Sequence, residues 1–212
     1  MKRFFATFAM TAALALAQQP AQAIETAGDY LEINPAQPTD VKRGQVEVVE
    51  FFWYRCPHCF ELEPELNAWS KKLPKDVVIK RVPGILNPSW AALARAFYAL
   101  EAVGMRERLH EDVFNAIHVQ GMDLSEPERF FDWAVTKGVD RKKIADAYNS
   151  FSVNTQVMRA QQMTGAFKLN GVPAFAVNGK YVTSAYMTGS VPALFNTLDE
   201  LIARERKKSG RK

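Results

Sequence analysis

The two cysteines of this sequence lie close together, in the segment Cys56-Pro57-His58-Cys59. One helical turn would bring their sulfurs within reach of each other, so they can form a disulfide in a small ring. Pro57 suits the first position of a helix, where its missing N–H costs nothing, and His58 adds a positive charge that depends on pH. A stabilised thiolate is a good leaving group, so this motif indicates a reactive, redox-active disulfide.

The elements predicted around the motif would place Cys56 at the start of a helix. Residues 46–53 form a β-branched and aromatic run, which predicts a buried strand before the motif. Residues 60–73 have an apolar helical face, with a kink expected at Pro64, and residues 77–82 predict a second strand. Because a helix N-terminus carries free N–H groups and partial positive charge, we expect it to lower the pKa of Cys56.

The same cysteines have three other possible uses. A structural disulfide that closes so short a loop would constrain the unfolded chain little. A zinc site needs four ligands, or three and a water, and the remaining histidines are His110 and His118, which we expect at the surface or rim of a predicted helix. A c-type haem site needs a histidine directly after the second cysteine, where Phe60 stands. Redox chemistry is therefore favoured over a metal site or an inert bridge.

The first 23 residues have the pattern of a signal peptide. A short basic segment precedes 14 uncharged residues, 4–17, which are too few to span a ~30 Å hydrocarbon core comfortably. Ala21 and Ala23 suit the pocket of a signal peptidase, so we expect cleavage after Ala23, although an uncut membrane anchor is the alternative. Export would place the chain in a compartment where disulfides persist.

The composition excludes several classes of protein. With 48% hydrophobic and 24% charged residues, the chain is typical of a globular protein and not of a disordered or low-complexity one. Two of the 27 Lys and Arg residues lie in the expected signal peptide, which leaves 25 basic against 23 acidic residues. This small excess gives little support for a nucleic-acid partner.

The middle of the chain is predicted to be helical. Ser125 and Glu128 have the spacing of a capping box, in which each side chain bonds to the backbone of the other residue. Asp140 is expected to cap a short helix. The other helical segments are expected at 89–103, 105–119, 127–137 and 152–169.

The last part of the chain returns to strands. Val172-Pro173 precedes two short apolar runs, 174–177 and 180–183, and the Asn-Gly pair between them is a strong hairpin signal. A final helix is expected after Ser190. A proline that opens a strand after such a turn is a candidate for a cis peptide bond, although the dipeptide alone favours trans.

Two segments resemble the DsbA family of thiol:disulfide oxidases. EFFWYRCPHC (residues 50–59) is similar to the active-site segment of that family, and GVPAFAVNGKY (residues 171–181) is similar to its cis-proline loop and hairpin. The resemblance implies an α/β protein with a thioredoxin-like fold and an inserted all-helical domain. The thioredoxin-like domain would comprise residues 24–84 and 161–212, and the helical insert residues 85–160.

The family also has a charged cluster beneath its active site. Glu50, Glu63 and Lys80 stand at the matching positions of this sequence. A lone carboxylate would be costly in the apolar strand that contains Glu50, so we expect Lys80, on the neighbouring strand, to be its partner. Glu63 could instead face water from the predicted helix.

The resemblance further implies an oxidase of the periplasm. It would donate the Cys56–Cys59 disulfide to reduced, unfolded secreted polypeptides, with Val172 and Pro173 beside the cysteines. A quinone-linked membrane partner of the DsbB type would reoxidise it. No other cofactor is expected, and the chain is expected to be a monomer.

Two rival functions remain open at this point. One is a disulfide reductase or isomerase on the same fold. Isomerases of this type usually carry a separate dimerisation domain, for which the residues before the motif leave little room. The other is a non-catalytic chaperone that binds peptides. Rapid oxidation of a reduced peptide would distinguish an enzyme from a carrier.

Overall fold

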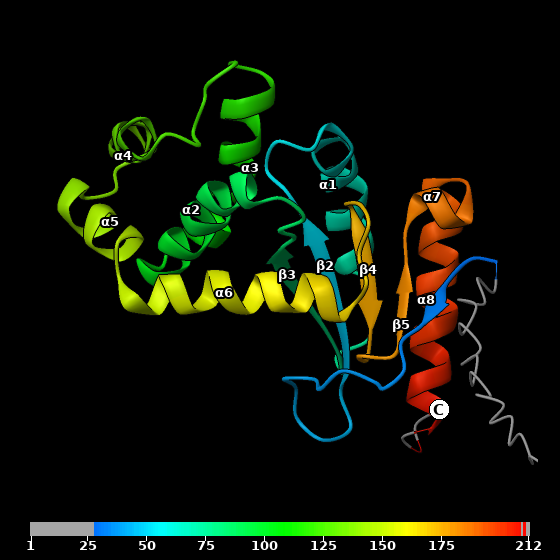
Figure 1. The fold of residues 1–212 in the computed structure, drawn as a ribbon. Coiled ribbons are helices and arrows are strands. Elements are labelled where there is room, and N and C mark those ends of the chain that lie inside the picture. Colours follow the sequence, from blue (N-terminus) through cyan, green and yellow to red (C-terminus); the bar gives the residue numbers. More distant parts are fainter. Residues whose placement is uncertain (1–27, 209, 211–212) are drawn as a thin grey trace, which may run out of the picture.

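The computed structural model describes residues 28–208 and 210, so the expected signal peptide and its cleavage site lie outside the described residues. Figure 1 shows a mixed sheet with helices on both of its sides. The elements in chain order are β1 Leu31–Glu32, β2 Val46–Phe52, α1 Pro57–Ser70, β3 Val77–Pro83, the short 3-10 helix η1 Pro88–Trp90, α2 Ala91–Ala102, α3 Arg106–His118, α4 Pro127–Thr136, α5 Arg141–Tyr148, α6 Phe151–Ala166, β4 Ala174–Val177, β5 Tyr181–Thr183, α7 Ala185–Thr188 and α8 Val191–Lys208.

The strands form one sheet in the order β1-β5-β4-β2-β3. β2 and β3 are parallel and are connected through α1, while β4 runs antiparallel to both β2 and β5. Glu50 lies opposite Arg81 in the β2–β3 register, and Val49 lies opposite Lys80. Because successive side chains of a strand point to opposite faces, this register assigns the charged residues of β3 to different sides of the sheet.

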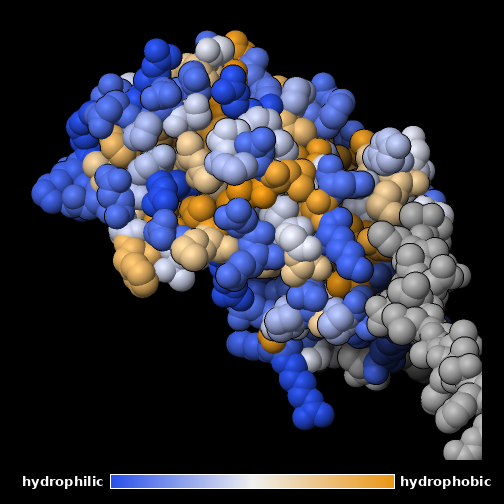
Figure 2. Space-filling view, viewed as in Figure 1, coloured by the Kyte–Doolittle hydropathy of each residue, from blue (hydrophilic) through white to orange (hydrophobic). Residues whose placement is uncertain are grey.

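Two hydrophobic cores cover the two faces of the sheet. On one face, α1 and α8 pack against alternate residues of β2, among them Val46 and Val48. On the other face, Val49 and Phe51 belong to a core shared with the inserted helices α2–α6. Figure 1 shows α2–α5 gathered beside the sheet, with α6 running back to it. Apolar residues lie at the middle of this view of the surface, with hydrophilic residues around them (Figure 2).

The structure confirms most of the predicted elements. The two predicted strands around the motif correspond to β2 and β3, and the Asn-Gly hairpin joins β4 to β5 with positive φ at both Asn178 and Gly179. Asp140 caps α5 by accepting a hydrogen bond from the backbone N–H of Lys143 at 2.8 Å. α1 continues through Pro64.

The predicted capping box at Ser125 is wrong. Its hydroxyl donates to Asp123 at 2.5 Å, and Glu126 occupies the N-cap position of α4 without a side-chain hydrogen bond. Because the helix starts one residue later than the capping box requires, Ser125 lies outside the N-cap position, and it bonds to Asp123 instead. The sequence also gave no indication of α7, whose four residues are too few for a helical period to be recognised.

The Val172–Pro173 peptide bond is cis, as the family resemblance implied and contrary to the preference of the dipeptide alone. Asn34–Pro35 is also cis, where the sequence indicated only a turn. The boundary expected after residue 160 falls inside α6. Within the described part of the chain, none of the helices has the length and apolar character needed to cross a membrane.

Candidate active site

Cys56 is the N-cap residue of α1, and Pro57 is the first residue of the helix. The backbone N–H of Cys56 donates to the carbonyl of Trp53 at 2.9 Å, which closes the turn between β2 and α1. Cys56 is 8% exposed and Cys59, one turn further along, is completely buried. Both are present as thiols. An incoming group can therefore approach the first sulfur more readily than the second.

The environment divides the two thiols into a nucleophile and a proton donor. The Cys59 side chain and the backbone N–H groups of Cys59 and His58 donate to Cys56, and they lower its pKa to about 6 although burial opposes them. Burial, followed by the bond to Cys56, raises the pKa of Cys59 well above its usual value. Near neutral pH, Cys56 is therefore a thiolate and Cys59 holds its proton.

His58 lies on the surface beside the cysteines. Its Nδ1 is 3.2 Å from Glu61 Oε2, and both side chains are largely exposed. The positive charge of His58 also lowers the pKa of Cys56, but less than the Cys59 thiol and the backbone donors do. The imidazole is thus a secondary source of thiolate stabilisation.

The cis-proline loop reaches Cys56 from the other end of the chain. The Cys56 sulfur lies 3.4 Å from the carbonyl oxygen of Val172 and can donate a hydrogen bond to it only when the thiol is protonated. Gly84, just after β3, donates to the carbonyl of Phe52 at 2.8 Å and lies under Val172. A Cβ at position 84 would stand 2.8 Å from Val172 Cγ1, so the absence of a side chain there allows the loop to approach.

Beneath Cys59, the structure brings together Glu50, Glu63 and Arg81. Arg81 Nε donates to Glu50 Oε2 at 3.0 Å, and Arg81 Nη2 donates to Glu63 Oε2 at 3.2 Å. Glu50 is completely buried and Glu63 is 4% exposed. Glu63 is therefore not an exposed residue of the helix, and both expected carboxylates belong to one cluster.

Lys80, expected as the partner of Glu50, does not reach this cluster, and that prediction is wrong. Its Nζ lies 2.8 Å from Glu47 Oε2 and 3.4 Å from Asp40 Oδ2. Lys80 and Arg81 are adjacent on β3 and point to opposite faces, and Arg81 is the one opposite Glu50. Arg81 thus holds the position that the sequence assigned to Lys80.

Two histidines of α3 also contact the site, although sequence reasoning left both out. His110 is 5% exposed, so its expected place at the surface is wrong. His118 Nε2 lies 2.8 Å from the carbonyl oxygen of Tyr54, and its ring stacks on Phe60 with centroids 4.9 Å apart. The signal available in the sequence is position, because His110 falls between the core residues Leu109 and Val113.

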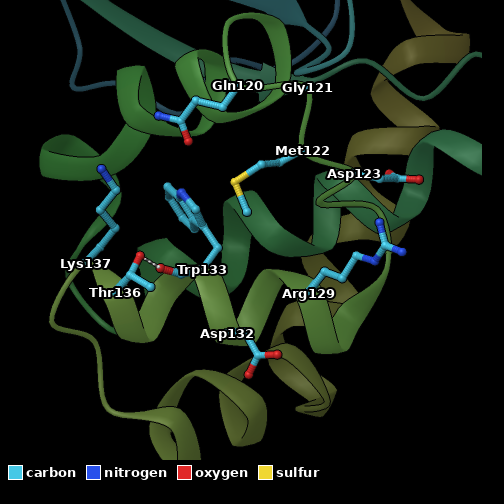
Figure 3. Close-up of a pocket in the computed structure, with 9 residues that line it drawn as sticks. All are labelled: Gln120, Gly121, Met122, Asp123, Arg129, Asp132, Trp133, Thr136 and Lys137. Carbon is cyan, nitrogen blue, oxygen red and sulfur yellow. Dashed lines mark hydrogen bonds between the residues drawn. The ribbon is translucent and has the colours of Figure 1, made fainter.

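Two hollows lie near this region. One, of about 510 Å³, opens between α1 and α3 and is lined by Phe60, Glu61, Glu63, Pro64, Asn67, Glu111, Phe114 and Asn115. The other, of about 550 Å³, lies in the helical insert and includes no cysteine (Figure 3). Asp123 lines it and lies 3.7 Å from Arg55, the residue before Cys56. Among the described residues, no group of three or more His, Cys, Asp or Glu side chains is placed to hold a metal ion.

Comparison with known proteins agrees with this geometry. Residues 47–195 match the family model of the DSBA-like thioredoxin domain. The chain is 39% identical over 210 residues to a "Thiol:disulfide interchange protein DsbA" from Burkholderia cepacia, covering 98% of this chain and 99% of that protein. A protein of the same name from Pseudomonas aeruginosa PAO1 is 39% identical over 202 residues, covering 93% of this chain and 95% of the relative.

Solved structures show the same relationship. The crystal structure of Pseudomonas aeruginosa DsbA superposes with a TM-score of 0.82 at 36% identity, covering 87% of this chain and 95% of that one. The oxidoreductase DsbA from Xylella fastidiosa gives a TM-score of 0.79 at 30% identity, covering 84% and 96%. The chain therefore belongs to the DsbA family, and it is a protein thiol:disulfide oxidoreductase with a thioredoxin-like fold and an inserted helical domain.

Proposed function

We propose that this chain oxidises reduced, unfolded secreted polypeptides by giving them its Cys56–Cys59 disulfide. The observation that carries the proposal is the position of Cys56 at the N-cap of α1, where its pKa falls to about 6. A stabilised thiolate favours the reduced form of the pair, so the disulfide form is a strong oxidant. Pro57 supports this by starting the helix directly after Cys56.

The exchange takes place in two displacements. A substrate thiolate attacks the Cys56 sulfur, the Cys56–Cys59 bond breaks, and Cys59 leaves and takes up a proton. The second substrate thiol loses its proton and attacks the substrate sulfur bonded to Cys56, which releases Cys56 as a thiolate. The two substrate thiols are oxidised to a disulfide, and the enzyme disulfide is reduced. Of the two substrate protons, one ends on Cys59 and one enters solvent at neutral pH.

Other residues around the cysteines have supporting roles in this proposal. The Val172 carbonyl and the cis Val172–Pro173 peptide lie against Cys56 and would orient the incoming chain. His58 would add positive charge to the thiolate form. Glu50 and Glu63, with Arg81 in the place expected for Lys80, would set the charge beneath Cys59.

We further propose that the chain is exported to the periplasm and cleaved after Ala23, acts as a monomer, and is reoxidised by a quinone-linked membrane partner of the DsbB type. The sequence pattern of residues 1–23 and the need of a disulfide donor for an oxidising compartment support this assignment. We also propose residues 24–84 and 161–212 as the catalytic domain and 85–160 as the insert. The redox disulfide would need no additional cofactor.

Reduction potential and peptide oxidation test the proposal together. The reduction potential of the active-site disulfide is near −120 mV in oxidases of this type and near −270 mV in thioredoxin. For the Cys56–Cys59 pair we expect a reduction potential close to the first value. Catalytic amounts of the chain, with excess oxidised glutathione, should form the disulfide of a reduced two-cysteine peptide, and Cys56→Ser should not. Brief iodoacetamide treatment of the reduced protein should label Cys56 before Cys59. A potential near thioredoxin's, with slow peptide oxidation, would favour a reductase instead.

A further inference from the structure

His110 joins the helical insert to the charged cluster beneath the cysteines. It lies on α3, and its ring packs edge-on against Phe52 and Phe114, with centroids 5.1 Å and 5.3 Å away. Its Nδ1 is 2.8 Å from the Tyr54 hydroxyl, and its Nε2 is 3.2 Å from Glu63 Oε1. Because the ring is buried, these two partners decide its tautomer and charge.

A neutral ring satisfies both hydrogen bonds. Burial raises the pKa of Tyr54 well above its usual value, so its hydroxyl keeps its proton and donates to Nδ1 of His110. Burial also lowers the pKa of His110, so the imidazole is neutral near neutral pH. The ring proton is then on Nε2, from which it donates to the Glu63 carboxylate.

The cluster contains two carboxyl groups that share the guanidinium of Arg81. If both Glu50 and Glu63 were ionised, the cluster would carry a net negative charge on two largely buried carboxylates. Burying an uncompensated charge is costly, and the usual response is that a group takes up a proton. One of the two carboxyl groups is therefore expected to be protonated near neutral pH.

The donors are divided unequally between the two carboxyl groups. Glu63 accepts hydrogen bonds from His110, Arg81 and Asn67, the last at 3.3 Å. Glu50 accepts from Arg81, and among the described residues its Oε1 has no partner. Burial and the charge of Glu63 raise the pKa of Glu50 to about 8. Burial would also raise the pKa of Glu63, but its donors hold that pKa below the usual value.

We propose that His110 is a positioning residue for disulfide exchange, because its hydrogen bond fixes the negative charge on Glu63 and leaves the shared proton on Glu50. The inference rests on the proposed function, in which Cys59 is the leaving group. The charge of an ionised Glu50 raises the pKa of Cys59 and would make it a poorer leaving group. A neutral Glu50 removes that obstacle, so a residue of the insert influences the rate of exchange.

The hollow between α1 and α3 offers a competing explanation. Glu63 lines that hollow, so water alone could keep it ionised while Glu50 stays buried. Charged and titratable groups also surround His110 on the neighbouring elements. They are Tyr54 before α1, Glu63 on α1, Arg81 on β3, and Arg106 and Glu107 on α3 itself. Glu50 on β2 is connected to them through Arg81.

The test is a carboxyl titration by NMR on the full reduced protein with ¹³C-labelled glutamate. In the wild type, Glu63 should titrate at lower pH than Glu50. His110→Phe keeps a ring of similar shape but removes the hydrogen bond to Glu63. In this variant the pKa of Glu63 should rise and that of Glu50 should fall. The difference between the two pKa values should narrow by at least about one unit, which is a tenfold change in the proton equilibrium between the two carboxyl groups. His110→Gln, which retains a donor, should restore most of the gap. His118→Leu, on the same helix, should leave both carboxyl groups unchanged.

Two further measurements keep the inference open to rejection. If His110→Phe is unstable, Tyr54→Phe/His110→Phe removes the unpaired hydroxyl and is titrated in its place. The ¹⁵N spectrum of the wild type should show His110 neutral and protonated at Nε2, whereas an Nδ1–H ring or an imidazolium would overturn the proposal. Unchanged carboxyl pKa values in a folded His110→Phe variant would also overturn it and would indicate hydration of Glu63.

The rate of disulfide exchange tests whether an ionised Glu63 and a protonated Glu50 matter for function. With a reduced dithiol peptide at neutral pH, His110→Phe should react more slowly than the wild type, because a rise in the pKa of Cys59 makes it a poorer leaving group. If the pKa values of Glu50 and Glu63 change in His110→Phe but the rate of peptide oxidation does not, then His110 has no influence on disulfide exchange. Failure of the proposed function would look different, because the wild type itself would then fail to oxidise the peptide.

Discussion

At the scale of single residues, the thiol of Cys59 is the first stabiliser of the Cys56 thiolate. It ranks before the backbone N–H groups of Cys59 and His58, and before the charge of His58. The sequence indicated the helix end and the histidine, but it could not show that Cys59 keeps its proton. That property depends on complete burial, which requires the packed structure.

Replacing Cys59 tests this order. Cys59→Ala should raise the pKa of Cys56 by about one to two units, because a hydrogen bond to a charged group contributes about 1.5–3 kcal/mol. Cys59→Ser retains an O–H donor and should raise the pKa less, and His58→Ala should also have a smaller effect than Cys59→Ala. The thiolate absorbance in the ultraviolet, followed against pH, measures each value. A larger effect from His58→Ala would show that the imidazole is the main stabiliser.

At the scale of elements, the pairing of β2 with β3 decides which cation meets Glu50. Both Lys80 and Arg81 are plausible from the sequence, since both lie on the neighbouring strand. A shift of one residue exchanges the two faces of a strand, and the sequence alone does not determine the register. The observed register puts Arg81 opposite Glu50 and turns Lys80 toward Glu47. The acids could therefore be predicted, whereas their partner could not.

Loss of Arg81 should cost more stability than loss of a cation from an exposed ion pair. Arg81→Met should lower the free energy of unfolding by about 3–5 kcal/mol near neutral pH, because it leaves Glu63 as an unpaired buried charge. Lys80→Met is not a suitable control, because its partner Glu47 is only 6% exposed. The control is Lys142→Met, which removes an ion pair with Asp146 whose side chains are both largely exposed, and it should change the free energy of unfolding much less. Urea unfolding measures both. Equal losses would mean that the Arg81 cluster contributes no more than a surface pair.

The same cluster predicts a dependence on pH. The folded pKa of Glu63 is lowered, so its contribution to stability is present above the unfolded pKa and disappears as the pH falls through the folded value. The difference between wild type and Arg81→Met should therefore shrink on acidification. A difference that stays constant down to about pH 3 would contradict the lowered pKa of Glu63.

The contact between the cis-proline loop and the end of β3 gives a second prediction at this scale. Gly84→Ala should destabilise the protein by about 1–3 kcal/mol and slow exchange, because the new Cβ would displace Val172, whose carbonyl meets Cys56. Gly165→Ala in α6 is the control, since its Cβ would meet nothing within 4 Å. The control should instead gain about 0.5–1 kcal/mol. Unfolding and peptide oxidation of both variants measure the effects, and similar results for the two would reject the role of Gly84.

At the scale of the whole molecule, the insert does more than cover one face of the sheet. Helical periodicity predicted α3 at nearly its observed length, together with its apolar face. It did not predict that His110 and His118 would turn toward β2 and the motif, because that depends on how α3 packs against α1. Local pattern therefore recovers the elements, and only tertiary packing shows that residues distant in sequence complete the site.

The stability of the whole chain should depend on both redox state and pH. The Cys56–Cys59 disulfide closes a short loop, which stabilises the oxidised form by about 2 kcal/mol. The reduced form gains instead from the Cys56 thiolate, whose folded pKa of about 6 lies below an unfolded value of about 8.5. A group with a lowered pKa contributes fully to the free energy of unfolding above its unfolded pKa and contributes nothing below its folded pKa. The stabilisation of the reduced form by the Cys56 thiolate is therefore negligible near pH 5 and about 2.5 kcal/mol near pH 8.

The oxidised protein should therefore be the more stable form near pH 5, and the reduced protein should overtake it above neutral pH. Urea unfolding of both forms across this range measures the crossing. The double variant Cys56→Ser/Cys59→Ser can form neither the disulfide nor the thiolate. Its free energy of unfolding therefore shows how the other titratable groups make stability depend on pH. If the difference between the two forms stays constant with pH, then folding does not stabilise the Cys56 thiolate. Strong oxidation by this chain would then lose its physical basis, because a pair without a stabilised thiolate has no driving force to give up its disulfide.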